Sequence, residues 1–136
     1  MPIFIWTDSK YSVNIKEVDE QHKKLVALIN CLHHVNQNNN DQGALGKVLD
    51  ELVGYTKYHF KREEELMKQY RYPDYSDHKS KHDNLVQQVL RMQKMYYIGT
   101  TGITIDIAIL LNDWIAEHIL VEDKKYSPYL SGSNVT

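Results

Sequence analysis

The stretch HFKREEELM, residues 59–67, holds one histidine and three consecutive glutamates in a segment whose apolar residues recur at helical spacing. An α-helix turns by about 100° per residue, which places Glu63 about 40° from His59 and on the same apolar face. Glu64 and Glu65 lie about 140° and 240° from His59, so we predict that both are solvated. A buried carboxylate without a partner is costly, so Glu63 must be paired or bind a metal ion.

The rest of the chain repeats this helical spacing and predicts an all-α fold. Four long helices joined by short loops indicate an up-down-up-down antiparallel four-helix bundle. We expect an extended N-terminal arm over residues 1–16 and one domain over 1–136, with Ser127-Pro128 closing the regular structure. The predicted helices span residues 18–38, 44–69, 76–98 and 104–124.

Composition narrows the class of protein. A formal net charge of −2 over 136 residues argues against a nucleic-acid binder. Cys31 is the single cysteine, which rules out an internal disulfide and fits a reducing compartment. Residues 1–10 lack the basic and apolar regions of a signal peptide, and no run is long enough for a membrane segment. We therefore expect a cytoplasmic protein, and we expect it to be a monomer.

Every predicted helix places at least one histidine on its apolar face, and we expect these histidines to lie at the same end of the bundle. Helices one and three carry theirs near the start, and helices two and four near the end. A lone buried histidine is usually held by a hydrogen bond, but five imidazoles in one core layer would be costly without an ion. Bundle cores are a known place for metal sites. The five residues are His22, His59, His78, His82 and His118.

The fourth helix leaves a second acidic ligand ambiguous. On a straight α-helix, Glu122 lies about 40° from His118 and Asp123 about 140° away. Ideal geometry favours Glu122, but a helix end can form a wider turn, so Asp123 stays open. His33 shares the face of His22 but lies about 16 Å farther along the axis, so we expect His33, like His34, to be structural.

The stretches HKKLVALI, HFKREEELM, HKSKH and WIAEHILVED carry a resemblance as a set. Their pattern H…HxxxE…HxxxH…HxxxxD resembles the hemerythrin family, in its bacterial single-domain branch (bacteriohemerythrins), over residues 22–123. The resemblance selects Asp123 over Glu122, which implies that helix four departs from α geometry after His118. It implies seven metal ligands: His22, His59, Glu63, His78, His82, His118 and Asp123.

The number and type of these ligands point to two metal ions. Zinc ordinarily takes four ligands, and nitrogen and oxygen donors without thiolate are compatible with iron. No histidine follows a glutamate by three residues, so the Glu-x-x-His repeats of ferritin-like oxidases are absent. The resemblance implies two irons bridged by Glu63, Asp123 and a solvent-derived oxo or hydroxo group. The three ligands His78, His82 and His118 would saturate one iron, and His22 and His59 would leave the other an open position.

This resemblance implies reversible O2 binding for storage, delivery or sensing, without catalysis. The alternatives are a di-iron redox enzyme on the same site, such as a peroxidase or nitric-oxide-handling protein, and a metal-binding protein without O2 chemistry. Apolar residues next to the ligands favour reversible O2 binding, although each of these residues could equally be an ordinary part of the core. These expected pocket residues are Leu25, Phe60, Trp114, Ile115 and Ile119.

Overall fold

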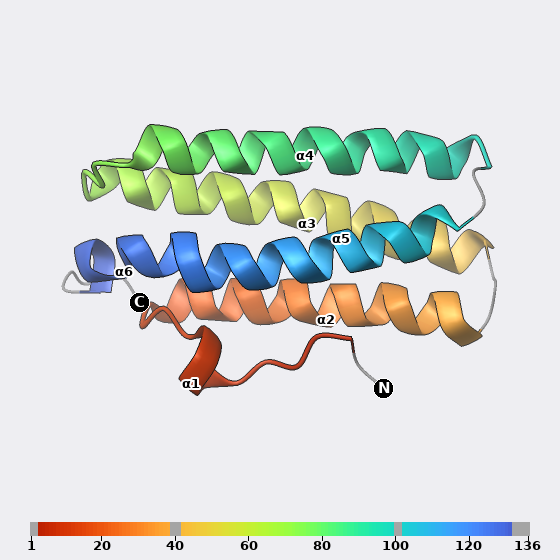
Figure 1. The fold of residues 1–136 in the computed structure, drawn as a ribbon, viewed down its shortest axis with the longest axis horizontal. Coiled ribbons are helices and arrows are strands. Elements are labelled where there is room, and N and C mark those ends of the chain that lie inside the picture. The colour runs from red at the N-terminus through yellow and green to blue at the C-terminus, as the bar shows by residue number, and fades with distance from the viewer. Residues whose placement is uncertain (1–2, 39–41, 100–101, 132–136) are drawn as a thin grey trace.

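The computed structural model describes residues 3–38, 42–99 and 102–131, and its main body is a four-helix bundle (Figure 1). Successive long helices run in opposite directions, so the predicted up-down-up-down topology is confirmed. Helix α2 packs against α3 and α5, and α4 packs against the same two helices. The four are α2 (Lys16–Asn38), α3 (Gln42–Gln69), α4 (Tyr75–Tyr97) and α5 (Ile103–His118).

Leucine and isoleucine side chains at helical spacing fill the middle of the bundle. Each fully buried side chain of this size contributes about 1.5–3 kcal/mol relative to an exposed one. Within the described ranges, no helix is both long enough and apolar enough to cross a bilayer. Core side chains with essentially no exposure include Ile29, Leu32, Leu49, Leu52, Leu66, Leu85, Ile107 and Leu111.

A tight turn after α3 sends the chain back toward the centre of the molecule. Arg71 adopts the left-handed conformation with φ of 56°. The Tyr72 N–H donates to the Met67 carbonyl at 2.9 Å, and the Arg71 N–H donates to the Lys68 carbonyl at 3.2 Å. This pair of bonds is a Schellman motif, which ends a helix and satisfies its last carbonyls. Helix α4 then returns along α3 and brings His78 back beside the end of that helix.

The N-terminal arm differs from the extended segment predicted for residues 1–16, because it contains the short helix α1 (Asp8–Tyr11). Its attachments are polar as well as apolar. The Asn30 side-chain amide donates to the Phe4 carbonyl at 2.8 Å and accepts from the Phe4 N–H at 2.9 Å. Asp19, in the first turn of α2, accepts from the Val13 N–H at 2.9 Å and ties the arm to that helix.

The predicted end of regular structure at Ser127-Pro128 is wrong, because helix α6 (Lys124–Ser131) runs through Pro128. Proline inside a helix costs about 3 kcal/mol or more. Tyr126 and Leu130 are both 0% exposed, and burying two such side chains contributes a comparable or larger amount. The Ser127 hydroxyl also donates to the Val13 carbonyl of the arm at 2.5 Å. Tertiary packing therefore overrides the local preference.

Candidate metal centre

All seven side chains predicted as ligands lie together at one end of the bundle. Helices α2 and α4 begin at this end, and α3 and α5 finish there (Figure 1). Each of the seven is at most 5% exposed. Two sets of donor atoms form within this layer, and either could hold a metal ion.

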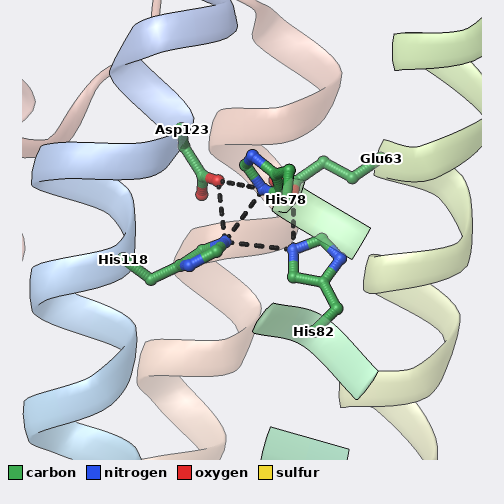
Figure 2. A group of neighbouring side chains, drawn as sticks. All are labelled: Glu63, His78, His82, His118 and Asp123. Atoms are coloured by element: carbon green, nitrogen blue, oxygen red, sulfur yellow. Dashed lines mark hydrogen bonds and ion pairs between the residues drawn. The ribbon is translucent and has the colours of Figure 1, made fainter. Parts of the chain in front are cut away.

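The first set is here called the three-histidine group (Figure 2). It consists of His78, His82 and His118 with one carboxylate oxygen each from Glu63 and Asp123. The Nε2 atom of His118 lies 2.9 Å from that of His78 and 3.0 Å from that of His82. Asp123 Oδ1 lies 3.0 Å from His78 Nε2 and 3.1 Å from His118 Nε2. Glu63 Oε1 lies 3.1 Å from His82 Nε2. Five donor atoms from α3, α4, the end of α5 and the short segment that follows α5 therefore converge.

The second set, here called the two-histidine group, consists of His22 and His59 with the other oxygen of Glu63, and the other oxygen of Asp123 lies beside His22. Glu63 Oε2 lies 3.1 Å from His59 Nε2 and 3.3 Å from His22 Nε2. Asp123 Oδ2 lies 3.1 Å from His22 Nε2. Both carboxylates thus present one oxygen to each group, which is how a carboxylate bridges two metal ions.

The donor set fits metal ions better than a hydrogen-bond network. Three imidazole nitrogens within 3.0 Å of their neighbours cannot all be satisfied by protons shared among themselves. Glu63 Oε1 and both Asp123 oxygens are buried and accept no hydrogen bond from the described residues. Buried carboxylate oxygens without a hydrogen-bond donor destabilise the fold unless another group, such as a metal ion, binds them. Nitrogen and oxygen donors without thiolate are compatible with iron.

Protons occupy part of this site when no ion is present. Burial lowers the pKa of His22, but the negative charges of Asp123 and Glu63, 3.1 and 3.3 Å from its Nε2 atom, outweigh burial and raise that pKa to about 9. The same opposing effects raise the pKa of His78 to about 10. Burial would raise the pKa of Glu63, yet interactions with His59 and His22 hold that pKa well below its ordinary value. Metal binding must therefore displace protons from histidine.

A local change of helix type brings Asp123 into the site. Residues Ile119–Asp123 form a π-helix, labelled η1, which continues directly from α5. Its wider i→i+5 turn places residues five apart on one face, so Asp123 comes beneath His118. Glu122 points elsewhere and accepts from the Lys81 ammonium at 2.6 Å. The departure from α geometry predicted after His118 is confirmed.

Glu64 is a correction to the sequence analysis, which predicted a solvated charge. Its Oε2 lies 2.8 Å from His82 Nδ1, and its side chain is only 16% exposed. The face about 140° from His59 points away from the bundle centre, but it points toward the neighbouring helix α4 rather than into water. Glu65, with a side chain 55% exposed, does match the prediction.

Two further residues contact the ligands and were not anticipated. The Tyr126 hydroxyl donates to Glu63 Oε2 at 2.8 Å, and burial with the charge of Glu63 raises the pKa of that phenol well above its ordinary value. Gln21 Oε1 lies 2.7 Å from His59 Nδ1. Tyr126 was missed because it follows the predicted end of helix four. Gln21 directly precedes His22, and nothing in its spacing marks it.

The five expected pocket residues separate into two kinds. Phe60 stacks on the His82 ring with centroids 3.8 Å apart, and Trp114 stacks on His118 at 4.2 Å. Both aromatic rings therefore contact the three-histidine group. The other three, Leu25, Ile115 and Ile119, are buried aliphatic side chains. Among the described residues, His33 and His34 belong to neither metal-binding set.

Comparison with known proteins gives a consistent result. The family model described as the hemerythrin HHE cation binding domain matches residues 13–130. Bacteriohemerythrin of Methylococcus capsulatus is 35% identical over 131 residues, which cover 96% of this chain and 99% of that protein. A hemerythrin-like protein of Naegleria gruberi is 36% identical over 127 residues, which cover 93% of both chains.

Solved structures agree with the sequence relatives. A crystal structure of wild-type hemerythrin has a TM-score of 0.89 and 35% identity, covering 95% of this chain and 98% of the other. A crystal structure of a hemerythrin mutant has a TM-score of 0.91 at 35% identity, covering 96% of this chain and 99% of the other. The similarity thus extends over the four bundle helices and the π-helix.

Proposed function

This chain belongs to the hemerythrin family, and from that premise we propose that it binds O2 reversibly at a pair of iron ions, for storage, delivery or sensing. We propose as ligands the three-histidine group for one ion and the two-histidine group for the other. The observation that carries this proposal is the sharing of Glu63 and Asp123, because each offers one oxygen to either group.

The two groups are unequal, and this inequality supports a binding role. The three-histidine group offers five protein donors, whereas the two-histidine group offers three, with Asp123 Oδ2 beside His22 as a fourth. With one solvent-derived oxo or hydroxo bridge, the second ion would keep an open position. The iron pair would supply that position and the electrons that O2 takes up when it binds.

The protein's own part is to hold the donors and to keep the surroundings apolar. Gln21 fixes the ring of His59 through its Nδ1 atom, and Tyr126 fixes the Glu63 carboxylate. We propose that Leu25, Ile115 and Ile119 complete an apolar pocket beside Phe60 and Trp114. Such a pocket limits access of water and protons, which favours reversible binding over turnover of O2.

The test is a visible absorption spectrum with metal analysis of the purified protein. The iron-loaded chain is reduced anaerobically, exposed to air, and then freed of oxygen again. We expect two irons per chain and a charge-transfer band that appears with O2 and disappears when O2 is removed. A band that persists after deoxygenation would favour the redox enzyme, and the absence of iron would refute the proposal.

A matched pair of histidine variants controls the experiment. His59→Ala removes a donor from the two-histidine group and is expected to abolish the oxygen-dependent band. His34→Ala removes an exposed histidine of α2 that lies outside both groups and is expected to leave the band unchanged. Equal loss in both variants would show that the band does not depend on the proposed ligands.

A further inference from the structure

We propose that Glu64 is a positioning residue that makes His82 the more electron-rich ligand, so that the ion of the three-histidine group loses its electron first. This inference rests on the proposed function, because it concerns the order in which the two ions are oxidised. Each ion loses one electron to an external one-electron oxidant, and no bond to the protein is made or broken.

The contact between Glu64 and His82 fixes the proton of the imidazole. His82 Nε2 faces the donor cluster, 3.1 Å from Glu63 Oε1, so its other nitrogen carries the hydrogen. That Nδ1–H donates to Glu64 Oε2 at 2.8 Å. A metal-bound histidine that donates to a carboxylate has a fixed tautomer and is a more basic ligand.

Burial and packing make this hydrogen bond effective. His82 is 0% exposed, and the Glu64 side chain is 16% exposed, so water screens the pair only in part. Phe60 lies parallel to the His82 ring, with 3.8 Å between centroids and 2° between planes. Stacking on Phe60 therefore fixes the plane of the His82 ring, and the hydrogen bond to Glu64 fixes its rotation within that plane.

The corresponding contact in the two-histidine group is neutral. His59 Nδ1 donates to the amide oxygen of Gln21 at 2.7 Å rather than to a carboxylate. The Gln21 amide in turn donates to Glu17 Oε2 at 3.3 Å, but the charge of Glu17 is balanced by Arg62, which binds both of its oxygens at 2.5 and 3.0 Å. A charged acceptor therefore stands behind His82 and an uncharged acceptor behind His59, which makes the two ions electronically different.

The first test needs neither iron nor O2. The protein is loaded with Zn²⁺, and the His82 Nδ1–H proton is observed by NMR in wild type and variants. We expect Glu64→Gln to move this resonance upfield, Glu64→Asp to restore part of the shift, and Glu65→Gln to leave the resonance in place. An unchanged His82 resonance in Glu64→Gln would overturn the proposal, whether or not the protein binds O2.

The second test measures the two one-electron potentials of the iron-loaded protein by mediated electrochemical titration. Mutating the hydrogen-bonding partner of a metal-bound ligand typically changes metal affinity by about 10–100-fold. If the affinity for the oxidised ion changes by this factor relative to the affinity for the reduced ion, the one-electron reduction potential changes by about 59–118 mV. We expect Glu64→Gln to raise the potential of the first couple by that amount, while the second couple and the Glu65→Gln control stay at wild-type values. Equal shifts of both couples, or no shift, would overturn the proposal.

Discussion

The π-helix predicts a sharp difference between two adjacent acids, Asp123 and Glu122. Asp123 is 1% exposed, and its oxygens lie 3.0–3.1 Å from nitrogens of His22, His78 and His118. In the metal-free protein at pH 7, the pKa values of about 9 for His22 and about 10 for His78 keep both rings charged. Asp123→Asn removes the charge that these rings face.

Breaking a buried ion pair from one side costs about 3–5 kcal/mol. With an unfolding entropy of about 2.1 cal/mol/K per residue, a chain of this length loses roughly 10–17 °C of Tm. The Glu122 side chain is 13% exposed, but the side chain of its partner Lys81 is 40% exposed, so water screens the pair. Pairs screened in this way contribute about 0–1 kcal/mol. Glu122→Gln is therefore expected to lower Tm by only about 3.5 °C or less.

The assay is thermal unfolding of the metal-free variants at pH 7, followed by circular dichroism. Isothermal titration with Zn²⁺ then gives the number of metal ions that each variant binds. We expect Asp123→Asn to lose both stability and a full metal complement, while Glu122→Gln keeps both. Equal losses in the two variants, or a larger loss in Glu122→Gln, would refute the reasoning from the π-helix.

Three further predictions concern the same layer of the core. First, the raised pKa values of His22 and His78 stabilise the metal-free fold below their unfolded value of 6.5, and this stabilisation is lost as pH rises through about 9 and 10. Tm of the metal-free protein should therefore fall between pH 7 and pH 10.5, and a flat profile would contradict the assigned protonation. Second, Tyr126→Phe removes a hydrogen bond to a carboxylate and should lower the free energy of unfolding by about 1.5–3 kcal/mol, measured in urea; a loss below about 0.5 kcal/mol would show that this bond is not stabilising. Third, Leu25→Ala empties a fully buried position and should cost about 2–5 kcal/mol in the same assay, whereas a loss typical of a surface site would show that the position collapses readily.

Periodicity was sufficient to predict the bundle and the layer in which the histidines meet. Each apolar face is a property of one helix, and short loops force neighbouring helices to run antiparallel. Those two facts bring His22, His59, His78, His82 and His118 to one end of the molecule before any contact is known. The monomeric state and the cytoplasmic location stay predictions of the sequence.

The misses share a physical cause, since each depends on a neighbour that is remote in sequence. Glu64 lies off the apolar face, and only the adjacent helix α4 gives it a partner in His82. Helix α6 continues through Pro128 because Tyr126 and Leu130 are buried against the bundle, which no local propensity records. The π-helix that selects Asp123 was reached through family resemblance, because ideal helix geometry favoured Glu122.

The most direct test of the central claim is a crystal structure of the iron-loaded protein with anomalous scattering measured at the iron absorption edge. The account predicts two anomalous peaks, about 3.5–4 Å apart as in other two-metal sites, with Glu63 and Asp123 each contacting both. One peak should lie among His78, His82 and His118, and the other beside His22 and His59. A single peak, or two peaks that share neither carboxylate, would contradict the account.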